Sequence, residues 1–205
     1  MIETNLQQEW DERYAAAEEL FSGKPNTVLV AEVGDLPPGR ALDVGCGEGA
    51  DAVWLASRGW AVTGLDVSRV ALERAADRAT EAGVEVTFIH DDLVSAELPA
   101  AGFDLVTAQY PALRSSADRA AERAITAAVA PGGVLLVVHH TGFDGEEAKA
   151  RGFDPADYVF PADVRTQLGD GWDVRFEESR PRATPLGGQE QRHTHDAVLF
   201  ARRLH

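Results

Sequence analysis

Residues 41–49, with the sequence ALDVGCGEG, constrain the fold of this chain more than any other segment. An apolar stretch runs into three closely spaced glycines, and a helical stretch begins at residue 50. A strand that enters a helix through glycines brings backbone N–H groups and the positive end of the helix dipole close to a ligand. A Cβ atom would block this approach or the positive φ angles of the turn. The segment therefore predicts a strand–turn–helix unit with a nucleotide-type ligand.

The glycine spacing limits which class of nucleotide ligand the turn can bind. It is Gly-x-Gly-x-Gly, whereas the dinucleotide fingerprint is Gly-x-Gly-x-x-Gly. Asp43, two residues before the first glycine, would repel a pyrophosphate but suits a ligand with an ammonium and a sulfonium. The run 42–49 resembles the first motif of class I S-adenosylmethionine-dependent methyltransferases. The resemblance implies S-adenosylmethionine as cofactor, with contacts at Gly45, Cys46, Gly47 and Gly49; we expect Cys46 to fill a crowded loop and not to act as a nucleophile.

Two further acidic sites follow the glycine turn at the spacing of this family. Asp66 ends the next apolar segment, about 20 residues on, where a carboxylate accepts the ribose hydroxyls. The alternative is that Asp66 caps the helix that starts at residue 68. The resemblance also implies cofactor contacts at Val67 and, for the adenine, at Asp92 and Leu93. A solvated acidic loop that includes Asp91 is the alternative at this second site.

Composition limits the class of protein. A chain of 205 residues with a net charge of −15 suits one domain, 1–205, and disfavours direct nucleic-acid binding, which needs clustered Lys and Arg. The N-terminus lacks a signal-peptide pattern, and no apolar run reaches the length of a membrane span. A single cysteine excludes an internal disulfide and indicates the cytoplasm. We expect a monomer or homodimer without membrane contact.

Alternation of short apolar strands with helical stretches predicts an α/β fold with a doubly wound, mostly parallel sheet. The predicted helices are 50–58, 68–82, 116–129 and 161–168, and the predicted strands are 40–44, 61–66, 84–90, 103–109, 134–139, 172–179 and 196–202. Residues 131–133 (PGG) predict a turn, and 180–189 a mobile loop. The resemblance implies that the last two strands form a reversed hairpin that completes a seven-stranded, Rossmann-like methyltransferase sheet.

The first 39 residues predict a helical appendage to this fold. Residues 10–14 (WDERY) and 21–26 (FSGKPN) resemble the N-terminal lid of methyltransferases of the tellurite-resistance and thiopurine type. The resemblance implies that aromatic side chains exclude water from the cofactor, with Tyr14 near it and Arg13 paired with its carboxylate. The alternative is an amphipathic helix that buries Trp10 and Tyr14 and leaves Arg13 in solvent.

The resemblance places the methyl acceptor at the end of segment 103–109. Gln109 and Tyr110 stand where the family contacts cofactor and acceptor, and they depart from the Asn/Asp-Pro-Pro-Tyr/Phe signature of many methyltransferases that act on amino groups. Tyr110 is also interpretable as a packed aromatic residue. His139 and His140 are candidate general bases, and because neighbouring strand residues face opposite ways, at most one faces the pocket. The alternative is a pair of polar strand-end histidines.

His193 and His195 have the spacing of metal ligands, but two histidines without a third ligand make a poor site, so we expect no metal. The leading hypothesis is methyl transfer to a small molecule: a thiol, a phenol or quinol, or a chalcogen species. One alternative is action on a macromolecule through a small activator protein. Asp43 and the glycine spacing argue against a nicotinamide oxidoreductase. A further alternative is a module that binds the cofactor as a sensor and has no catalytic activity.

Overall fold

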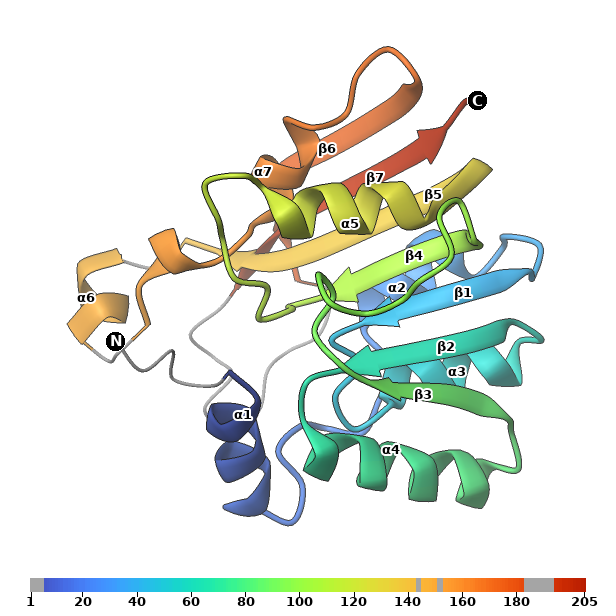
Figure 1. Cartoon of the computed structure of the whole chain (residues 1–205), viewed down its shortest axis with the longest axis vertical. Coiled ribbons are helices and arrows are strands. Elements are labelled where there is room, and N and C mark those ends of the chain that lie inside the picture. Colours follow the sequence, from blue (N-terminus) through green and yellow to red (C-terminus); the bar gives the residue numbers. More distant parts are fainter. Residues whose placement is uncertain (1–5, 143–144, 151–152, 183–193) are drawn as a thin grey trace. The chain divides into compact units, whose positions relative to one another are not determined.

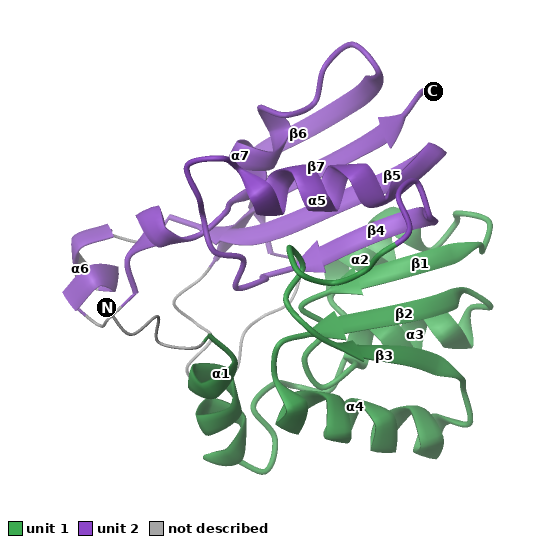
Figure 2. Cartoon of the chain, in the orientation of Figure 1, with its two compact units in different colours: residues 1–98 green, residues 99–205 purple. Residues whose placement is uncertain are grey.

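The computed structural model describes residues 6–142, 145–150, 153–182 and 194–205. The chain divides into two compact units, Met1–Leu98 and Pro99–His205, shown in green and purple in Figure 2. Seven strands occur in the order β3-β2-β1-β4-β5-β7-β6 (Figure 1). The predicted doubly wound, seven-stranded methyltransferase fold is confirmed. That residues 1–205 act as one domain with a lid at 1–39 stays a prediction.

The first unit contains a three-stranded parallel sheet with helices beside it. Its elements are α1 (Leu6–Ala15), α2 (Thr27–Val33), β1 (Arg40–Val44), α3 (Ala50–Ser57), β2 (Ala61–Asp66), α4 (Arg69–Ala82) and β3 (Val86–His90). Strand β1 is buried in this unit's core after its first residue, with Ala41, Leu42 and Val44 as its apolar side chains. The central strand β2 pairs with both β1 and β3. Parallel pairing aligns the C-terminal ends of β1 and β2, where Asp43 and Asp66 lie.

Helix α4 has clear signals at both ends. The Ser68 hydroxyl accepts a hydrogen bond from the Ala71 N–H at 3.2 Å, which is an N-cap. Gly83 ends the helix with a φ of 66°. Because Gly83 takes this left-handed conformation, β3 begins at Val86 and not at Val84 as predicted.

The second unit carries the reversed hairpin that the family resemblance implied. Its elements are β4 (Phe103–Gln109), α5 (Ala120–Ala128), β5 (Val129–Thr141), α6 (Gly145–Ala150), a 3₁₀ turn (Pro155–Asp157), α7 (Pro161–Arg165), β6 (Trp172–Pro181) and β7 (His195–Arg203). Strands β4 and β5 are parallel, whereas β7 lies antiparallel between β5 and β6. This register sets His140 on β5 opposite Asp196 on β7.

Several predicted boundaries in this unit are wrong, and α7 ends at Arg165 and not at residue 168. The turn at 131–133 belongs to β5, which starts at Val129; an irregularity of the β4–β5 register between Phe103 and Leu105 accommodates the extra residues. Helix α5 starts at Ala120, not at residue 116, because Arg119 has a φ of 55°. The loop predicted at 180–189 does not begin at residue 180, since β6 extends to Pro181; residues 183–193 lie outside the described part.

Candidate functional site

The glycine turn after β1 has a backbone that other residues do not readily adopt. Gly45, Gly47 and Gly49 have φ angles of 69°, 52° and 79°. A Cβ on Gly47 would lie 2.7 Å from the Tyr14 hydroxyl, and one on Gly49 would lie 2.8 Å from the Ala75 Cβ. The turn therefore needs glycine both for its conformation and for its close packing.

The N–H groups of this turn are used within the protein. Gly45 and Cys46 donate to the Leu65 carbonyl at 2.8 and 3.1 Å, and Gly49 donates to the Cys46 carbonyl. Gly47 donates to the Asp66 carboxylate at 2.8 Å. In this structure these four N–H groups have partners within the protein, and their predicted contact with a ligand stays a prediction. A pyrophosphate needs such donors, so the turn fits a ligand without phosphate.

Asp43 lies at the end of β1 with 2% of its surface exposed. Its Oδ2 has no hydrogen-bond partner among the described residues, and the Ala52 N–H donates to the carboxylate. Burial, with the Asp51 and Asp66 carboxylates nearby, raises the pKa of Asp43 well above its usual range. A buried carboxylate oxygen without a partner is costly, and a cationic group of a ligand would satisfy it. The residue thus fits the positively charged methionine part of S-adenosylmethionine.

Asp66 ends β2 and is also buried. Its Oδ1 accepts a hydrogen bond from the Ser68 N–H, and its Oδ2 accepts one from Gly47, both at 2.8 Å. Each carboxylate oxygen has a second lone pair, so the ribose role stays chemically possible. The side chain that caps helix α4 is Ser68 and not Asp66, and Val67 beside it is half-buried.

The acidic pair after β3 forms a local turn. The Asp91 N–H donates to the Asp66 carbonyl at 3.2 Å, which joins this turn to the end of β2. The Asp92 carboxylate accepts from the Val94 N–H at 2.8 Å, and Leu93 is buried. The predicted unit-one residues at the ends of β1, β2 and β3 therefore lie along one edge of the sheet, as the parallel pairing requires.

Cys46 and Tyr14 are both buried beside these carboxylates. Burial and the charges of Asp43 and Asp66 raise the pKa of the Cys46 thiol. Burial, with Asp66 and Glu48, raises the pKa of the Tyr14 hydroxyl. Both groups therefore stay protonated at neutral pH, and Cys46 has none of the thiolate character that a nucleophile needs.

Hydrogen bonds tie the N-terminal segment to the glycine turn and to α4. Asp11 accepts from the Ser68 hydroxyl at 2.7 Å, and Arg74 donates to the carbonyls of Tyr14 and Ala17. Glu48, inside the glycine turn, accepts from Arg74 at 2.7 Å and from the N–H groups of residues 20 and 21. Sequence reasoning missed the roles of Glu48 and Arg74, although Glu48 lies within the motif.

Arg13 does not take part in these contacts. Its side chain is exposed, and its guanidinium lies 4.8 Å from the centre of the half-buried Trp10 ring. The structure therefore agrees in this respect with the alternative expectation of a packed helix whose arginine faces solvent. Its predicted pairing with the cofactor carboxylate stays a prediction.

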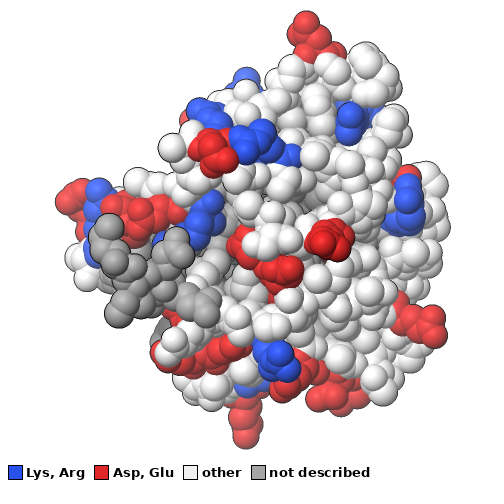
Figure 3. Space-filling model, viewed as in Figure 1, with Lys and Arg blue, Asp and Glu red and all other residues white. Residues whose placement is uncertain are grey.

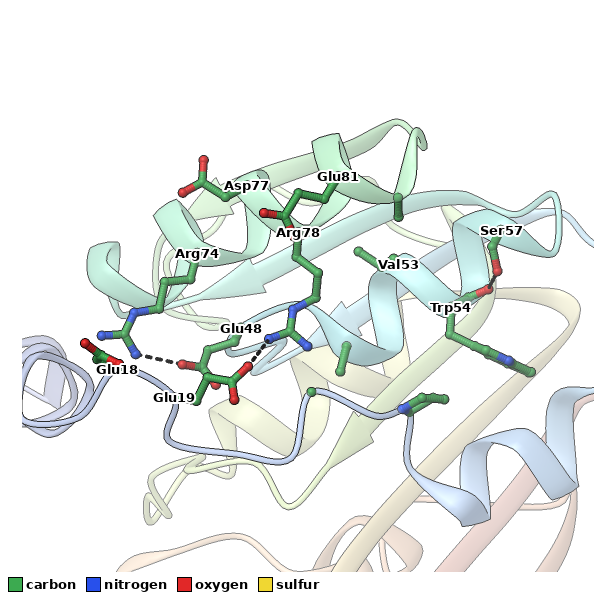
Figure 4. A pocket seen from close by; sticks show the side chains of 14 residues that line it. Glu18, Glu19, Glu48, Val53, Trp54, Ser57, Arg74, Asp77, Arg78 and Glu81 are labelled. Atoms are coloured by element: carbon green, nitrogen blue, oxygen red, sulfur yellow. Dashed lines mark hydrogen bonds and ion pairs between the residues drawn. The ribbon is translucent and has the colours of Figure 1, made fainter.

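Glu48 and Arg74 also line a groove of about 640 Å³ between the N-terminal segment, α3 and α4. Figure 4 shows this ion pair, and a second one between Arg78 and Glu19, among the labelled side chains. The lining residues of the groove do not include Asp43 or Asp66. The groove is thus distinct from the carboxylates at the strand ends.

The predicted site residues of the second unit form a cluster of their own. Tyr110 follows β4 with a φ of 55°, and its ring stacks on His140 with 4.2 Å between centroids. The Tyr110 hydroxyl donates to Asp196 Oδ2 at 2.9 Å, and His140 Nδ1 lies 3.1 Å from Asp196 Oδ1. Asp196 was not predicted, because only the β5–β7 register brings it opposite His140.

Gln109 and His139 are both buried in this unit. Gln109 donates through its amide to the Thr107 hydroxyl at 2.9 Å, and its Oε1 has no hydrogen-bond partner among the described residues. The His139 ring packs against Phe160 with 4.5 Å between centroids, in an edge-to-face arrangement. Both histidines lie near Tyr110, but His140 stacks on its ring at 4.2 Å between centroids, whereas the His139 ring is 6.4 Å away in an edge-to-face arrangement.

The predicted absence of a metal site is not tested over the whole chain. His193 lies outside the described residues, and His195 Nδ1 lies 2.9 Å from the Thr194 hydroxyl. In the described ranges no group of three or more His, Cys, Asp or Glu side chains has an arrangement that would hold a metal ion. The same ranges contain no helix of the length and hydropathy that a membrane span requires.

Charged side chains are mixed on the surface shown in Figure 3. Lys and Arg lie in small groups separated by Asp and Glu, and they do not merge into one basic surface on this face. On the face that Figure 3 shows, the described residues therefore form no large positive patch of the kind that binds a nucleic-acid backbone.

Parts of this chain are similar to known proteins. Residues 41–133 match the family described as "Methyltransferase domain". An uncharacterized methyltransferase of Mycobacterium tuberculosis is 40% identical over 97 residues, which are 47% of this chain and 48% of that protein. The chain thus spans about half the length of the first curated relatives that it matches.

Two further similarities cover more of the chain. A probable thiol methyltransferase 2 of Arabidopsis thaliana is 31% identical over 175 residues, which are 80% of this chain and 66% of that protein. A solved structure described as "Conversion of a Disulfide Bond into a Thioacetal Group during Echinomycin Biosynthesis" is 25% identical. It aligns with a TM-score of 0.74 over 97% of this chain and 92% of that one.

Proposed function

We propose that this chain, which belongs to the class I S-adenosylmethionine-dependent methyltransferases, transfers the methyl group of S-adenosylmethionine to a small-molecule acceptor. The observation that carries the proposal is the buried Asp43 carboxylate, whose Oδ2 has no partner in the described residues and lies before a turn whose N–H groups are used internally. This arrangement suits a ligand that brings positive charge and no phosphate.

The residues present fit the cofactor. Asp43 would hold the ammonium, Asp66 the ribose hydroxyls, and Asp92 with Leu93 the adenine, while Gly45, Cys46, Gly47, Gly49 and Val67 would surround it. When bound, S-adenosylmethionine supplies an activated methyl group on a sulfonium. The protein's part is then to hold acceptor and methyl group in line, which is worth roughly 7–11 kcal/mol.

The N-terminal segment supports a water-excluding role for residues 1–39. Tyr14 is buried with its hydroxyl against Gly47, and Glu48 holds residues 20 and 21 through their N–H groups. We infer that this segment covers the cofactor, as in the tellurite-resistance and thiopurine type of methyltransferase. Tyr14 would line the covered site, and Arg13 would reach the cofactor carboxylate by leaving Trp10.

The names of two similar proteins point to sulfur as the acceptor atom. One is a probable thiol methyltransferase, and the description of the solved structure names the conversion of a disulfide bond into a thioacetal group. Gln109 is proposed to contact the cofactor, and Tyr110 with one of His139 and His140 is proposed to act on the acceptor. We propose that the protein acts in the cytoplasm. That it is a monomer or homodimer, and that it could need an activator subunit, stay predictions.

A methyl-transfer screen tests the proposal. Labelled S-adenosylmethionine is offered with thiols, phenols, quinols and chalcogen oxyanions, with and without cell extract. Label in a thiol or phenol with the purified protein supports a small-molecule acceptor. Label only in macromolecules of the extract would contradict it and favour the activator-dependent alternative.

A further inference from the structure

The buried carboxylate of Asp196 lies at the centre of a polar cluster near the C-terminal ends of β4 and β5. The Asp196 side chain is 2% exposed, and it contacts the Tyr110 hydroxyl and the His140 ring. Arg182 completes the cluster: its Nε lies 3.7 Å from Asp196 Oδ2, and its Cζ lies 5.3 Å from the Tyr110 ring centre. In open α/β sheets, ligands bind beyond the carboxyl ends of the parallel strands.

Two groups that favour opposite tautomers face Nδ1 of the His140 ring. Nδ1 lies 3.1 Å from Asp196 Oδ1 and 3.0 Å from an Arg182 nitrogen. A carboxylate only accepts hydrogen bonds, so a bare Nδ1 lone pair facing it would be repelled. An arginine N–H only donates, so the approach of Arg182 to Nδ1 favours a lone pair there, and only Nε of Arg182 is recorded near Asp196 Oδ2, at 3.7 Å. A base at Nε2 requires the arrangement in which Nδ1 donates to Asp196, with the lone pair of the neutral ring on Nε2.

A purely structural network is the alternative, and two observations argue against it. The His140 side chain is 24% exposed, whereas a residue that only satisfies a buried acid gains nothing from reaching solvent. Tyr110, which stacks on this ring, holds a left-handed backbone conformation that is unfavourable for a non-glycine residue and that is concentrated at functional sites.

We propose that His140 is the general base of methyl transfer, oriented by Asp196 as a positioning residue, and that the acceptor is a thiol or hydroxyl that arrives protonated. This inference rests on the proposed function. The acceptor's proton passes to His140 Nε2, and the electron pair it leaves forms the bond to the methyl group. The bond between methyl and sulfonium breaks with its electron pair retained by sulfur, and the imidazolium then releases its proton to water.

The tautomer is measurable without activity. In ¹⁵N-edited NMR of the full chain with S-adenosylhomocysteine bound, we expect neutral His140 to be protonated at Nδ1. In Asp196→Asn the amide donates to Nδ1, so we expect the proton at Nε2. Protonation at Nε2 in the unchanged protein would overturn the proposal. Binding of S-adenosylhomocysteine itself tests the proposed function separately.

Rates distinguish a base from a structural residue. The probes are 4-nitrothiophenol, which is ionised at neutral pH, and 2-mercaptoethanol, which is not. His140→Gln should lower transfer to 2-mercaptoethanol by about 10²–10⁴-fold and leave 4-nitrothiophenol within about threefold. His205→Gln, at an exposed histidine, is the control. Equal losses of transfer rate with both thiols would overturn the proposal. If neither thiol is methylated, the NMR measurement of the His140 tautomer decides alone.

Discussion

Asn26 donates two hydrogen bonds of 2.7 Å to the Asp51 carboxylate, one from its backbone N–H and one from its side-chain amide. Asp51 lies in the first turn of α3 and is buried. Burial raises the pKa of Asp51, and the two bonds from Asn26 oppose that shift. The pair therefore fixes the end of the N-terminal segment to the helix that follows the glycine turn.

Asn26→Ala should destabilise the protein. It leaves a buried carboxylate oxygen without its side-chain donor, which costs about 1–3 kcal/mol in the free energy of unfolding. Urea denaturation measures this loss. Gln8→Ala, which removes an exposed bond to Glu12, is the control and should change stability by less than about 0.5 kcal/mol. Equal losses in both variants would contradict a structural role for the Asn26–Asp51 pair.

Gly47→Ala should be more damaging than its backbone angle alone explains. The new Cβ would lie 2.7 Å from the Tyr14 hydroxyl, in addition to the cost of about 1–2 kcal/mol for a left-handed residue. Gly83→Ala isolates the backbone cost, since nothing lies within 4 Å of its Cβ position. Calorimetric binding of S-adenosylhomocysteine and thermal unfolding are the measurements.

Tyr14→Phe in the Gly47→Ala background tests the clash directly. Without the hydroxyl, the nearest ring atom is 3.8 Å from the new Cβ, an ordinary contact. The double variant should recover stability to the level of Gly83→Ala. No recovery would show that Tyr14 and Gly47 are not packed as described.

Asp43→Asn should separate stability from binding. A pKa raised in the folded state means that Asp43 contributes stability below its unfolded pKa, near 3.9, and that this contribution is lost as pH rises through the folded pKa. In urea denaturation, the free energy of unfolding of Asp43→Asn should therefore rise relative to that of the unchanged protein between about pH 5 and about pH 8. Asp35→Asn, at an exposed acid, should show no such trend.

The same variant should bind S-adenosylhomocysteine about 10–100-fold more weakly, because it loses a charge-assisted hydrogen bond to the ammonium. Unchanged affinity at neutral pH would remove Asp43 from the cofactor site.

Glu48→Gln should loosen the N-terminal segment. The Glu48 carboxylate is 4% exposed and accepts from Arg74 and from two backbone N–H groups. Loss of its charge weakens each of these bonds, so hydrogen exchange at Leu20 and Phe21 should accelerate. Glu19→Gln is the control, because that acid is 71% exposed in its pair with Arg78. Similar exchange in both variants would contradict the anchoring role of Glu48.

The cofactor half of the site was accessible from the sequence, since its acids and glycines are set by local spacing within one βαβ unit. Strands β1, β2 and β4 have the predicted bounds because each is a short, mostly apolar segment. The cluster around Asp196 was not accessible, because His140 and Asp196 meet only through the register of two antiparallel strands. The hydrogen-bond partners of the glycine-turn N–H groups could not be predicted either, since they depend on where the Leu65 carbonyl and the Asp66 carboxylate lie.

Calorimetric titration with S-adenosylhomocysteine tests the central claim most directly. We predict a dissociation constant on the order of 1 μM, about −8 kcal/mol. Asp66→Ala should weaken binding by at least about tenfold, through loss of the charge-assisted bonds to the ribose hydroxyls, while Asp35→Ala should leave it unchanged. No heat with S-adenosylhomocysteine, together with binding of NADH, would contradict the assignment of this site to S-adenosylmethionine.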